Sequence, residues 1–593
     1  ETHWEGQLST SALSTATASV ALYLYGSSPA TNDPKRYLEL ASSGADWLAR
    51  NANDDGGWGD TIRSVSNIST TTLCWATLSL LDSNGDRDAA RERAASWIAE
   101  RSGTLEPETL SRTIIDVYGE DRTFSVPILT MCALCGVLGE GRDAWKHVIP
   151  LPFELASLPQ KTFQFLGLPV VSYALPALIA IGRVRHESRP SRNPIARITR
   201  TLTRGRTMRV LDAIQPTNGG FLEATPLTSF VAMSLIGAGL ASHDVTRRCI
   251  EFLSQSAFDD GSWPIDTNLA TWVTTLSINA LADAGRLDEL SSADRDAVGD
   301  WLLGQQYREV HPYTGAAPGA WAWTDLPGGV PDADDTPGAL LALHHLGCDR
   351  PEFREAAARG ISWLLDLQNR DGGVPTFCRG WGKLPFDRSG ADLTAHTLRA
   401  LHAWKDSLID VTGAPTSDEM RRAAERMLAY LRDVQNSDGS WTPLWFGNQF
   451  APENENRSYG TAKVLHGLQV LAADWPLAAE IKRRAEGWFV RIQNPDGGWG
   501  GQANVESSVE ETALALDALA RSDVEAGDAI RRGVEWLTTA IDESRHDAAT
   551  PIGFYFANLW YFETLYPLTF AISGLGSVQR YAGDSLSFDP SSK

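Results

Sequence analysis

"WFVRIQNPDGGW", residues 488–499, is the stretch of the sequence that decides the fold. It joins the end of an amphipathic segment to Gln493, an Asp-Gly-Gly run and Trp499. Glycine after the acidic residue supplies the positive φ of a tight turn, and the Asp side chain can bind the local backbone. The Gln amide can reach a neighbouring helix end while the Trp ring packs across it. The stretch therefore predicts a turn that fastens one helix to the next.

Related turns recur along the chain. They end at Trp58, Phe221, Trp263, Trp321, Val374, Trp441 and Trp499. From residue 221 onward the ends lie about 40 to 70 residues apart, which leaves room for two helices and their connections. Most turns precede a segment of period near 3.6, such as residues 510–522, whereas the strand signal is weak throughout. The sequence predicts an all-α protein whose helix pairs either stack into an open solenoid or close into a ring.

Composition narrows the class of function. The chain has 593 residues, 43% of them hydrophobic, which is ordinary for a globular protein. A formal net charge of −22, without a zinc-finger spacing or an aromatic-basic face, argues against nucleic acid as a partner. Cys132 and Cys135 form a CxxC in an apolar, helix-like run, and no second Cys or His pair has metal-ligand spacing. We expect these cysteines to be buried in a helical core.

Three aspartates are crowded into "GGVPDADDTPGAL", residues 328–340. Pro331 favours an extended chain, so Asp332, Asp334 and Asp335 fall at the start of a helix. One interpretation is an acidic first turn or N-cap. The other is a Brønsted acid, because neighbouring carboxyls cannot all ionise and one can keep its proton for a weak base such as an alkene. Metal binding is a rival, but Mg²⁺ sites of this kind accompany diphosphate chemistry, and the sequence has no DDxxD pattern.

Together, the repeated QxxDGxW turns and the "DADDT" element resemble the class II terpene cyclases of the squalene-hopene and oxidosqualene cyclase superfamily. The resemblance extends along nearly the whole chain. It implies two (α/α) toroids: residues 31–250 would form a first, less regular one, and residues 1–30 with 251–593 a catalytic (α/α)6 toroid. It also implies that neither a metal nor an organic cofactor is required.

The resemblance assigns roles to the polar residues. Asp334, the middle aspartate of the motif, would donate the proton, with Asp332 and Asp335 as supporting carboxylates. The segment "ADLTAHTLRAL" matches a helix start whose histidine hydrogen-bonds the acid in the family. This match implies that His396 binds the acid and that Asp392 belongs to the same polar network.

The resemblance also implies an aromatic cavity whose rings stabilise carbocations by cation–π attraction, about 0.5 to 2 kcal/mol for each ring. The implied cavity residues are Trp272, Trp323, Phe377, Trp445, Tyr459, Phe554 and Tyr555. Taken singly, each of these rings is also explained by ordinary core packing.

Several positions depart from the family pattern. Pro337 follows the DDT where alanine is common, Val374 replaces a turn aromatic, and a polar stretch lies between Trp445 and Tyr459. A glutamate expected in the first helix falls near Ser14 or Thr15. These departures leave the final product open.

Two consecutive segments bear on membrane association. Residues 163–182 are almost wholly apolar, but Pro169 and Pro176 argue against a membrane span. Residues 183–209 then carry nine arginines and one glutamate. This basic stretch has three interpretations: a solvated surface, a dock for anionic lipid, or a site that neutralises a diphosphate. The resemblance favours peripheral, monotopic attachment at the cytoplasmic face of a membrane, and a homodimer remains open.

The expected function is cyclisation of a linear polyprenoid, started by protonation, with squalene or a related triterpene as substrate. A class II cyclase of a prenyl diphosphate or a meroterpenoid is the alternative. A protein prenyltransferase subunit shares the helical ring, but it needs a zinc set of Asp, Cys and His that the sequence does not supply. A non-catalytic helical binding scaffold would keep the turns without depending on the aspartates.

Overall fold

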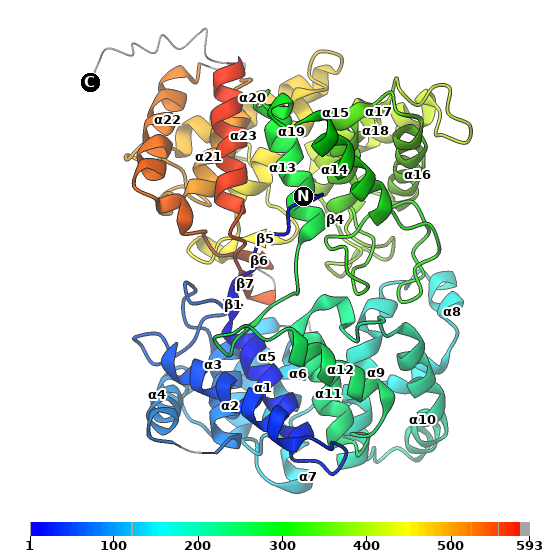
Figure 1. Ribbon diagram of the computed structural model, residues 1–593, viewed down its shortest axis with the longest axis vertical. Helices are drawn as coiled ribbons and strands as arrows, with labels where there is room; N and C mark the ends of the chain where they lie inside the picture. The colour runs from blue at the N-terminus through cyan, green and yellow to red at the C-terminus, as the bar shows by residue number, and fades with distance from the viewer. Residues whose placement is uncertain (1, 83, 120–122, 523–524, 555–556, 582–593) are drawn as a thin grey trace.

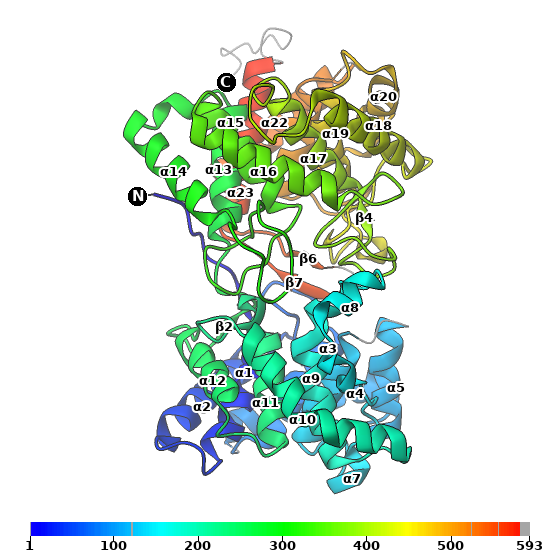
Figure 2. The same cartoon turned by 90° about the vertical axis from the view of Figure 1, so that its right-hand side faces the viewer.

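The computed structural model describes residues 2–82, 84–119, 123–522, 525–554 and 557–581. Its helices form two domains, one above the other in Figure 1, with short strands at the junction between them. Figure 2 shows the same division from the side. The all-α prediction is confirmed.

The first domain is a ring of helices with a second layer outside it. The inner helices are α1 (Ala12–Gly26), α3 (Ile68–Leu80), α6 (Ser125–Leu134), α9 (Val171–Ser188) and α11 (Thr225–Gly237). Each packs on the next, and α11 packs on α1 to close the ring. The outer helices are α2 (Pro34–Arg50), α4 (Gly85–Ser102), α5 (Pro107–Tyr118), α10 (Pro194–Ile214) and α12 (Asp244–Gln255). Short helices α7 (Gly141–Ala144), η1 (Phe153–Ser157) and α8 (Gln160–Phe165) complete the domain.

The second domain repeats the plan more regularly. Its inner helices are α13 (Ala270–Asp283), α15 (Asp335–Gly347), α17 (Ala391–Trp404), α19 (Arg457–Gln469), α21 (Val509–Leu519) and α23 (Tyr566–Tyr581). Neighbours in this order pack together, and α23 packs on α13, so this ring is closed too. The outer helices are α14 (Ser292–Gln305), α16 (Pro351–Leu367), α18 (Ser417–Asp433), α20 (Pro476–Ile492) and α22 (Gly527–Asp542).

All strand pairs are short and antiparallel. Strand β1 (Thr10–Ser11) pairs with β2 (Trp263–Pro264), and β3 (Val374–Pro375) pairs with β4 (Ser389–Gly390). Strand β6 (Ile552–Phe554) lies between β5 (Phe446–Gly447) and β7 (Leu559–Tyr561), with Phe446 opposite Phe554. This small sheet lies at the domain junction.

The predicted turn chemistry is present. In the turn that opened the sequence, Gly497 has φ of 97°. The Gln493 side chain donates to the carbonyl of Gly497 (2.7 Å) and to that of Ala529 (2.8 Å) near the start of α22. One glutamine therefore ties the turn to the next outer helix.

The tryptophan of this turn joins two helices. The Nε1 atom of Trp499 donates to the carbonyl of Phe489 in α20 (2.9 Å), and its backbone N–H donates to Thr512 Oγ1 in α21 (2.9 Å). The corresponding backbone bonds elsewhere run from Trp58 to Thr71, Trp263 to Thr15, Trp321 to Thr336, Val374 to Thr394 and Trp441 to Thr461. The inner-helix threonine is a part of the repeat that the sequence analysis missed.

The expected domain boundary was wrong in two respects. Helix α1 belongs to the first domain and not to the second, because the Trp263 N–H donates to Thr15 Oγ1 (3.0 Å) and so makes α1 the last inner helix of the first ring. The residues before α1 do reach the second domain, where the Trp4 N–H donates to Thr274 Oγ1 (3.0 Å). Helix α12, which contains residue 250, also packs in the first domain.

Replacing Thr15 tests this ring closure. Thr15→Val leaves the buried N–H of Trp263 without its acceptor, and we expect the variant to lose about 1 to 3 kcal/mol of unfolding free energy. Thr17→Val is the matched control, since the equally buried Thr17 hydroxyl donates only to carbonyls of its own helix. Urea unfolding of both variants measures the difference. Equal losses would contradict the closure role.

Candidate active site

The inner helices of the second domain begin at the end that faces the first domain; in Figure 1, α13 and α23 rise from the junction. The first turns of these helices carry several of the predicted polar and aromatic residues, together with Tyr566, which was not predicted. They supply Trp272 from α13, Asp335 from α15, Asp392 from α17, Tyr459 from α19 and Tyr566 from α23. Ring closure therefore gathers at one place residues that lie far apart in the sequence.

The three aspartates differ in what their carboxyl groups bind. Asp332 Oδ1 accepts hydrogen bonds from the backbone N–H of Asp334 (2.9 Å) and of Asp335 (2.8 Å), so it binds the backbone at the start of α15. The loop itself is fixed, because the Asp332 N–H donates to the carbonyl of Trp321 (3.0 Å). Asp334 occupies the N-cap position of α15 but makes no side-chain cap hydrogen bond, so the N-cap interpretation does not account for its carboxyl group.

Burial and mutual repulsion hold protons on this cluster. Burial raises the pKa of Asp332 to about 7. Burial also raises the pKa of Asp334 well above its usual value, and the charges of Asp392 and Asp332 add to that effect. The pKa of Asp335 is raised well above its usual value by burial and then by Asp332 and Asp334. Because such neighbours cannot all ionise, the cluster keeps acidic protons near neutral pH.

Asp392 lies at the start of the adjacent inner helix. Its Oδ1 accepts a hydrogen bond from the Leu444 N–H (3.1 Å), which favours the carboxylate, but burial dominates and raises its pKa to about 6. Asp392 acts on Asp334 by charge, which places it in the polar network that the resemblance implied.

His396 does not make the expected bond. Among the residues that the structure describes, its ring has no hydrogen bond to any of the aspartates, because it lies about one helical turn further along, beside Gly338. Nε2 is 3.6 Å from the place that a Cβ on Gly338 would occupy. Burial, then Arg399 and Lys463, lower the pKa of His396 well below its usual value. The imidazole is therefore neutral near neutral pH and supplies no positive charge to the acid.

A continuous series of rings leads from the first domain into the second. Tyr173, from α9, lies 5.1 Å from Phe377 between ring centroids. Phe377 meets Trp445 edge-on at 6.0 Å, Trp445 meets Phe554 at 5.0 Å, and Phe554 meets Tyr561 at 6.3 Å. These separations are typical of favourable aromatic pairs.

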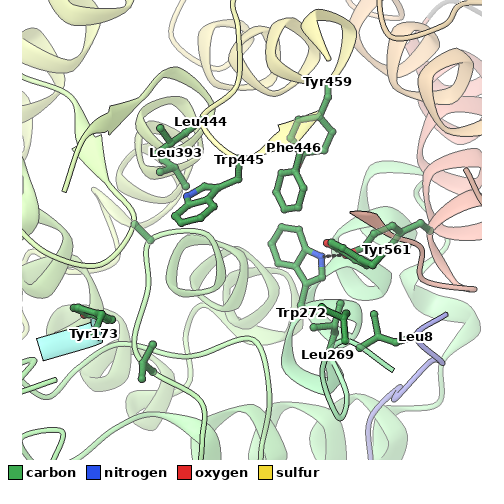
Figure 3. Packing of buried hydrophobic residues seen from close by; sticks show 14 of the residues in the cluster. Leu8, Tyr173, Leu269, Trp272, Leu393, Leu444, Trp445, Phe446, Tyr459 and Tyr561 are labelled. Atoms are coloured by element: carbon green, nitrogen blue, oxygen red, sulfur yellow. Dashed lines mark hydrogen bonds between the residues drawn. The ribbon is translucent and has the colours of Figure 1, made fainter. Parts of the chain in front are cut away.

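A second group of rings lies across the same space (Figure 3). Trp272 stacks on Phe446 at 6.5 Å, and Phe446 lies 4.9 Å from Tyr459. Trp272 Nε1 donates to the Tyr566 hydroxyl (2.9 Å), which is 3.1 Å from the Tyr561 hydroxyl. The indole N–H of Trp272 and the hydroxyls of Tyr561 and Tyr566 are therefore paired.

The structure places most of the predicted aromatic residues within this wall. Trp323 joins it through the backbone only, since its carbonyl accepts from the Trp272 N–H (3.1 Å) and no ring contact links its indole to another described aromatic residue. Tyr555 lies outside the described residues. The sequence analysis missed five rings, namely Tyr173, Phe386, Phe446, Tyr561 and Tyr566. The aromatic-rich segment 551–568 signalled Tyr561 and Tyr566, but only the folded chain shows which rings face inward.

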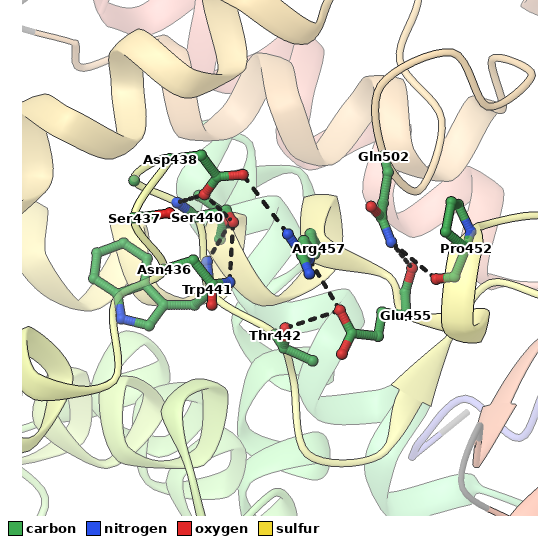
Figure 4. Close-up of polar contacts among 12 residues, drawn as sticks. Asn436, Ser437, Asp438, Ser440, Trp441, Thr442, Pro452, Glu455, Arg457 and Gln502 are labelled. Carbon is green, nitrogen blue, oxygen red and sulfur yellow. Dashed lines mark hydrogen bonds and ion pairs between the residues drawn. The ribbon is translucent and has the colours of Figure 1, made fainter.

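The polar stretch between Trp445 and Tyr459 is held firmly (Figure 4). The Arg457 side chain lies 2.9 Å from Glu455 Oε2 and 3.7 Å from Asp438 Oδ2, across the neighbouring turn. Gln502 Nε2 donates to the carbonyls of Pro452 (3.2 Å) and Glu455 (3.1 Å). The departure from the family pattern thus forms an anchored loop beside the cavity aromatics.

Comparison with known proteins agrees with this architecture. Residues 268–573, more than half of the chain, match the squalene-hopene cyclase C-terminal domain, and residues 10–124 match the prenyltransferase alpha-alpha toroid domain. The chain belongs to the squalene-hopene cyclase family. Among the described residues, no group of His, Cys, Asp and Glu is arranged to hold a metal ion.

Individual relatives are distant. A terpene cyclase–glycosyl transferase fusion protein of Humicola fuscoatra is 32% identical over 58% of this chain and 28% of its own length. The squalene–hopene cyclase of Zymomonas mobilis is 30% identical over 46% of this chain and 43% of its own. The chain therefore spans less than half the length of either relative. The ent-copalyl diphosphate synthase of Streptomyces platensis, 18% identical, shares the fold over 97% of this chain and 96% of its own, with a TM-score of 0.58.

The raised pKa of Asp334 predicts how stability depends on pH. In the unfolded chain this carboxyl ionises near pH 3.8, whereas in the folded chain it ionises well above that, so ionisation favours unfolding. The stabilising contribution is complete below the unfolded pKa and is lost as pH rises towards the folded pKa. We expect Asp334→Asn to exceed the wild type in unfolding free energy at pH 8 and to approach it near pH 4.

Chemical unfolding across this pH range measures the effect. Asp349→Asn, at an exposed carboxyl just beyond the other end of α15, is the control. Its unfolding free energy should change with pH in the same way as that of the wild type. Parallel curves for the wild type and Asp334→Asn would contradict the raised pKa.

Proposed function

We propose that the protein is a class II cyclase that protonates a linear polyprenoid at Asp334 and folds it into a polycyclic product. The observation that carries the proposal is the meeting of a buried, proton-retaining carboxyl cluster with a wall of aromatic rings in a closed helical ring. Squalene or a related triterpene is the proposed substrate, which agrees with the names of the relatives.

Each part of the site has a chemical task in the proposed reaction. The carboxyl proton of Asp334 moves to a terminal alkene carbon, or to an epoxide oxygen, and leaves a carboxylate and a carbocation. The N-terminus of α15 stabilises that negative charge. Successive alkenes then attack the cation, the aromatic faces stabilise each new centre, and the exclusion of water prevents early capture. Loss of a proton, or attack by water, ends the cascade.

A shorter substrate with a diphosphate headgroup is the second candidate, because the fold extends to a copalyl diphosphate synthase. Such a substrate would use the same acid but would respond to Mg²⁺ or to basic residues that bind the headgroup. The third alternative, a non-catalytic binding scaffold, is disfavoured. Burying several carboxyl groups costs free energy, and a protein that only binds its ligand does not need them.

Product analysis tests the proposal. Purified protein incubated with squalene, oxidosqualene and geranylgeranyl diphosphate, each with and without Mg²⁺, should convert one polyprenoid to a cyclic product seen by mass spectrometry. Asp334→Asn should reduce turnover at least ~1000-fold, because the reaction loses its acid. Asp349→Asn should leave turnover within about twofold of the wild type, as a surface change. An active Asp334→Asn variant would exclude Asp334 as the donor.

We also propose that the protein docks on anionic membranes through α10 and its surroundings. Ile195, Ile198 and Leu202 form an exposed stripe on α10, each of them 60% to 78% accessible. This spacing puts them on one face of the helix. Phe165 and Leu166, at the end of α8, are exposed as well. An apolar stripe with arginines beside it is the pattern of a helix that lies in a lipid interface.

Eight of the nine arginines fall into two sets, and the ninth, Arg189, donates to the carbonyl of Arg142. Arg183 and Arg204 pair with Glu187, Arg200 pairs with Glu154, and Arg185 donates to a backbone carbonyl, so these four stabilise the domain. The exposed arginines without an ion pair among the described residues are Arg192, Arg197, Arg206 and Arg209. The second set is available to lipid phosphates. Within the described ranges, α9 and every other helix fall short of the length and apolar character that crossing a membrane requires.

Changing the second set to glutamine should weaken binding to vesicles with anionic lipid by about 1 kcal/mol for each arginine at low salt, with little effect on neutral vesicles. Vesicle sedimentation measures the partitioning. The control with the same change of charge replaces four exposed arginines of the second domain, Arg421, Arg422, Arg483 and Arg531. Unchanged partitioning of the first variant would contradict the docking proposal.

A further inference from the structure

Lys463 is a charged residue inside the second ring whose role the reaction above leaves open. It lies on the inner helix α19, one turn after Tyr459, in an apolar segment. It lines an interior cavity to which α13, α15, α17, α19, α21 and α23 all contribute side chains. Among the described residues its ammonium group makes no hydrogen bond and no ion pair within 4 Å. An enclosed ammonium in this position is costly unless nearby charges favour it.

Two aromatic rings fix the position of the ammonium group. Nζ lies 5.2 Å from the ring centroid of Tyr459 and 5.5 Å from that of Phe570 on α23. Both distances are within cation–π range. Tyr459 belongs to the aromatic wall of the site, so the charge of Lys463 lies beside that wall.

The other charged groups that face Lys463 come from several helices. They are Asp283 from α13, Asp334 immediately before α15, Asp392, His396 and Arg399 from α17, His466 from α19 itself, and Asp517 from α21. Most of them are already engaged. Arg399 pairs with Asp283 (3.6 Å), and Asp517 lies 3.3 Å from His466 Nε2. Asp334 is different, because no side-chain hydrogen bond to its carboxyl group occurs in the described structure.

The electrostatic environment fits a charged lysine beside this acid. Burial lowers the pKa of Lys463 to about 8, while Asp334, Asp517 and Asp392 act to raise it, so the ammonium persists at neutral pH. Burial lowers the pKa values of His396 and His466 well below their usual value. The charge that favours the carboxylate of Asp334 therefore comes from Lys463 rather than from a histidinium.

We propose that Lys463 is the positioning residue that sets the acidity of Asp334, by stabilising the carboxylate that remains after the proton has left. The inference rests on the proposed function and names its acid-tuning cation. A nearby positive charge makes Asp334 a stronger acid in the cavity and also narrows the pH range over which it stays protonated. The neutral His396 leaves this role to the lysine.

The test compares Lys463→Met with Lys463→Arg. Turnover requires protonated Asp334, so the initial rate of the wild type should fall at high pH. Without the charge, the pKa of Asp334 rises. The pH at which the initial rate falls, the alkaline limb of the pH–rate profile, should therefore be ~1 unit or more higher in Lys463→Met than in the wild type. Its maximal rate should fall ~10-fold or more, because the acid is weaker. Lys463→Arg keeps the positive charge, so its alkaline limb should match that of the wild type and its maximal rate should stay close to the wild-type rate.

A second readout separates this inference from the proposed function. The infrared C=O band of the protonated carboxyl, identified as the part of the band that Asp334→Asn loses, can be titrated without substrate. Its midpoint should be higher in Lys463→Met than in the wild type. If no polyprenoid is converted but the midpoint shifts, the proposed function fails and the role of Lys463 stands.

Two outcomes would overturn the role of Lys463. One is an unshifted infrared midpoint in Lys463→Met; the other is a lower rate without any movement of the alkaline limb, as a merely structural residue would give. Because the substitution removes a half-buried charge without a close partner, we expect Lys463→Met to fold, with an unfolding midpoint no lower than that of the wild type. If it does not fold, Lys463→Gln provides the same neutral comparison.

Discussion

The second ring depends on one repeated hydrogen bond, from the backbone N–H of a turn residue to a threonine on the next inner helix. Trp499 with Thr512 and Trp321 with Thr336 illustrate it. The bond sets where each inner helix begins relative to the turn before it, so closing the ring brings the helix starts together. The N-terminal ends of helices favour negative charge. A fold built this way can hold several carboxyls at one buried point, which an isolated helix could not do at the same cost.

The same constraint explains how the site combines opposite requirements. An acid strong enough for an alkene must lose its proton readily, yet it must hold that proton near neutral pH before the substrate arrives. Burial and the neighbouring Asp392 and Asp332 hold the proton on Asp334. The helix start and the Lys463 ammonium favour the carboxylate. The rings of Trp272, Phe446 and Tyr459, which stand across the cavity, then offer π-faces to the positive charge that the proton creates.

Much of this could be read from the sequence, and the failures have physical reasons. Turn glycines and glutamines act within a few residues, so their roles were predictable, and the spacing of "DADDT" gave the start of α15. The placement of α1 was missed because it depends on a bond between Thr15 and Trp263, residues almost the length of a domain apart. The prediction of a hydrogen bond between His396 and Asp334 was wrong, because the spacing of a motif places a residue on its own helix but does not say how far along the neighbouring helix its partner lies. Lys463 was not singled out from the sequence, because its role depends on neighbours contributed by other helices.

Solvent exchange offers the most direct test of the central claim, that Asp334 starts the reaction by giving a proton to the substrate. Turnover of the accepted polyprenoid in D₂O, after the carboxyl has exchanged, should give a product that carries one deuteron at the carbon, or on the hydroxyl oxygen formed from the epoxide, where cyclisation begins. For an alkene substrate this label survives return to H₂O and is read by mass spectrometry. A cyclic product without deuterium at that carbon would show that the reaction starts in another way and would contradict the account.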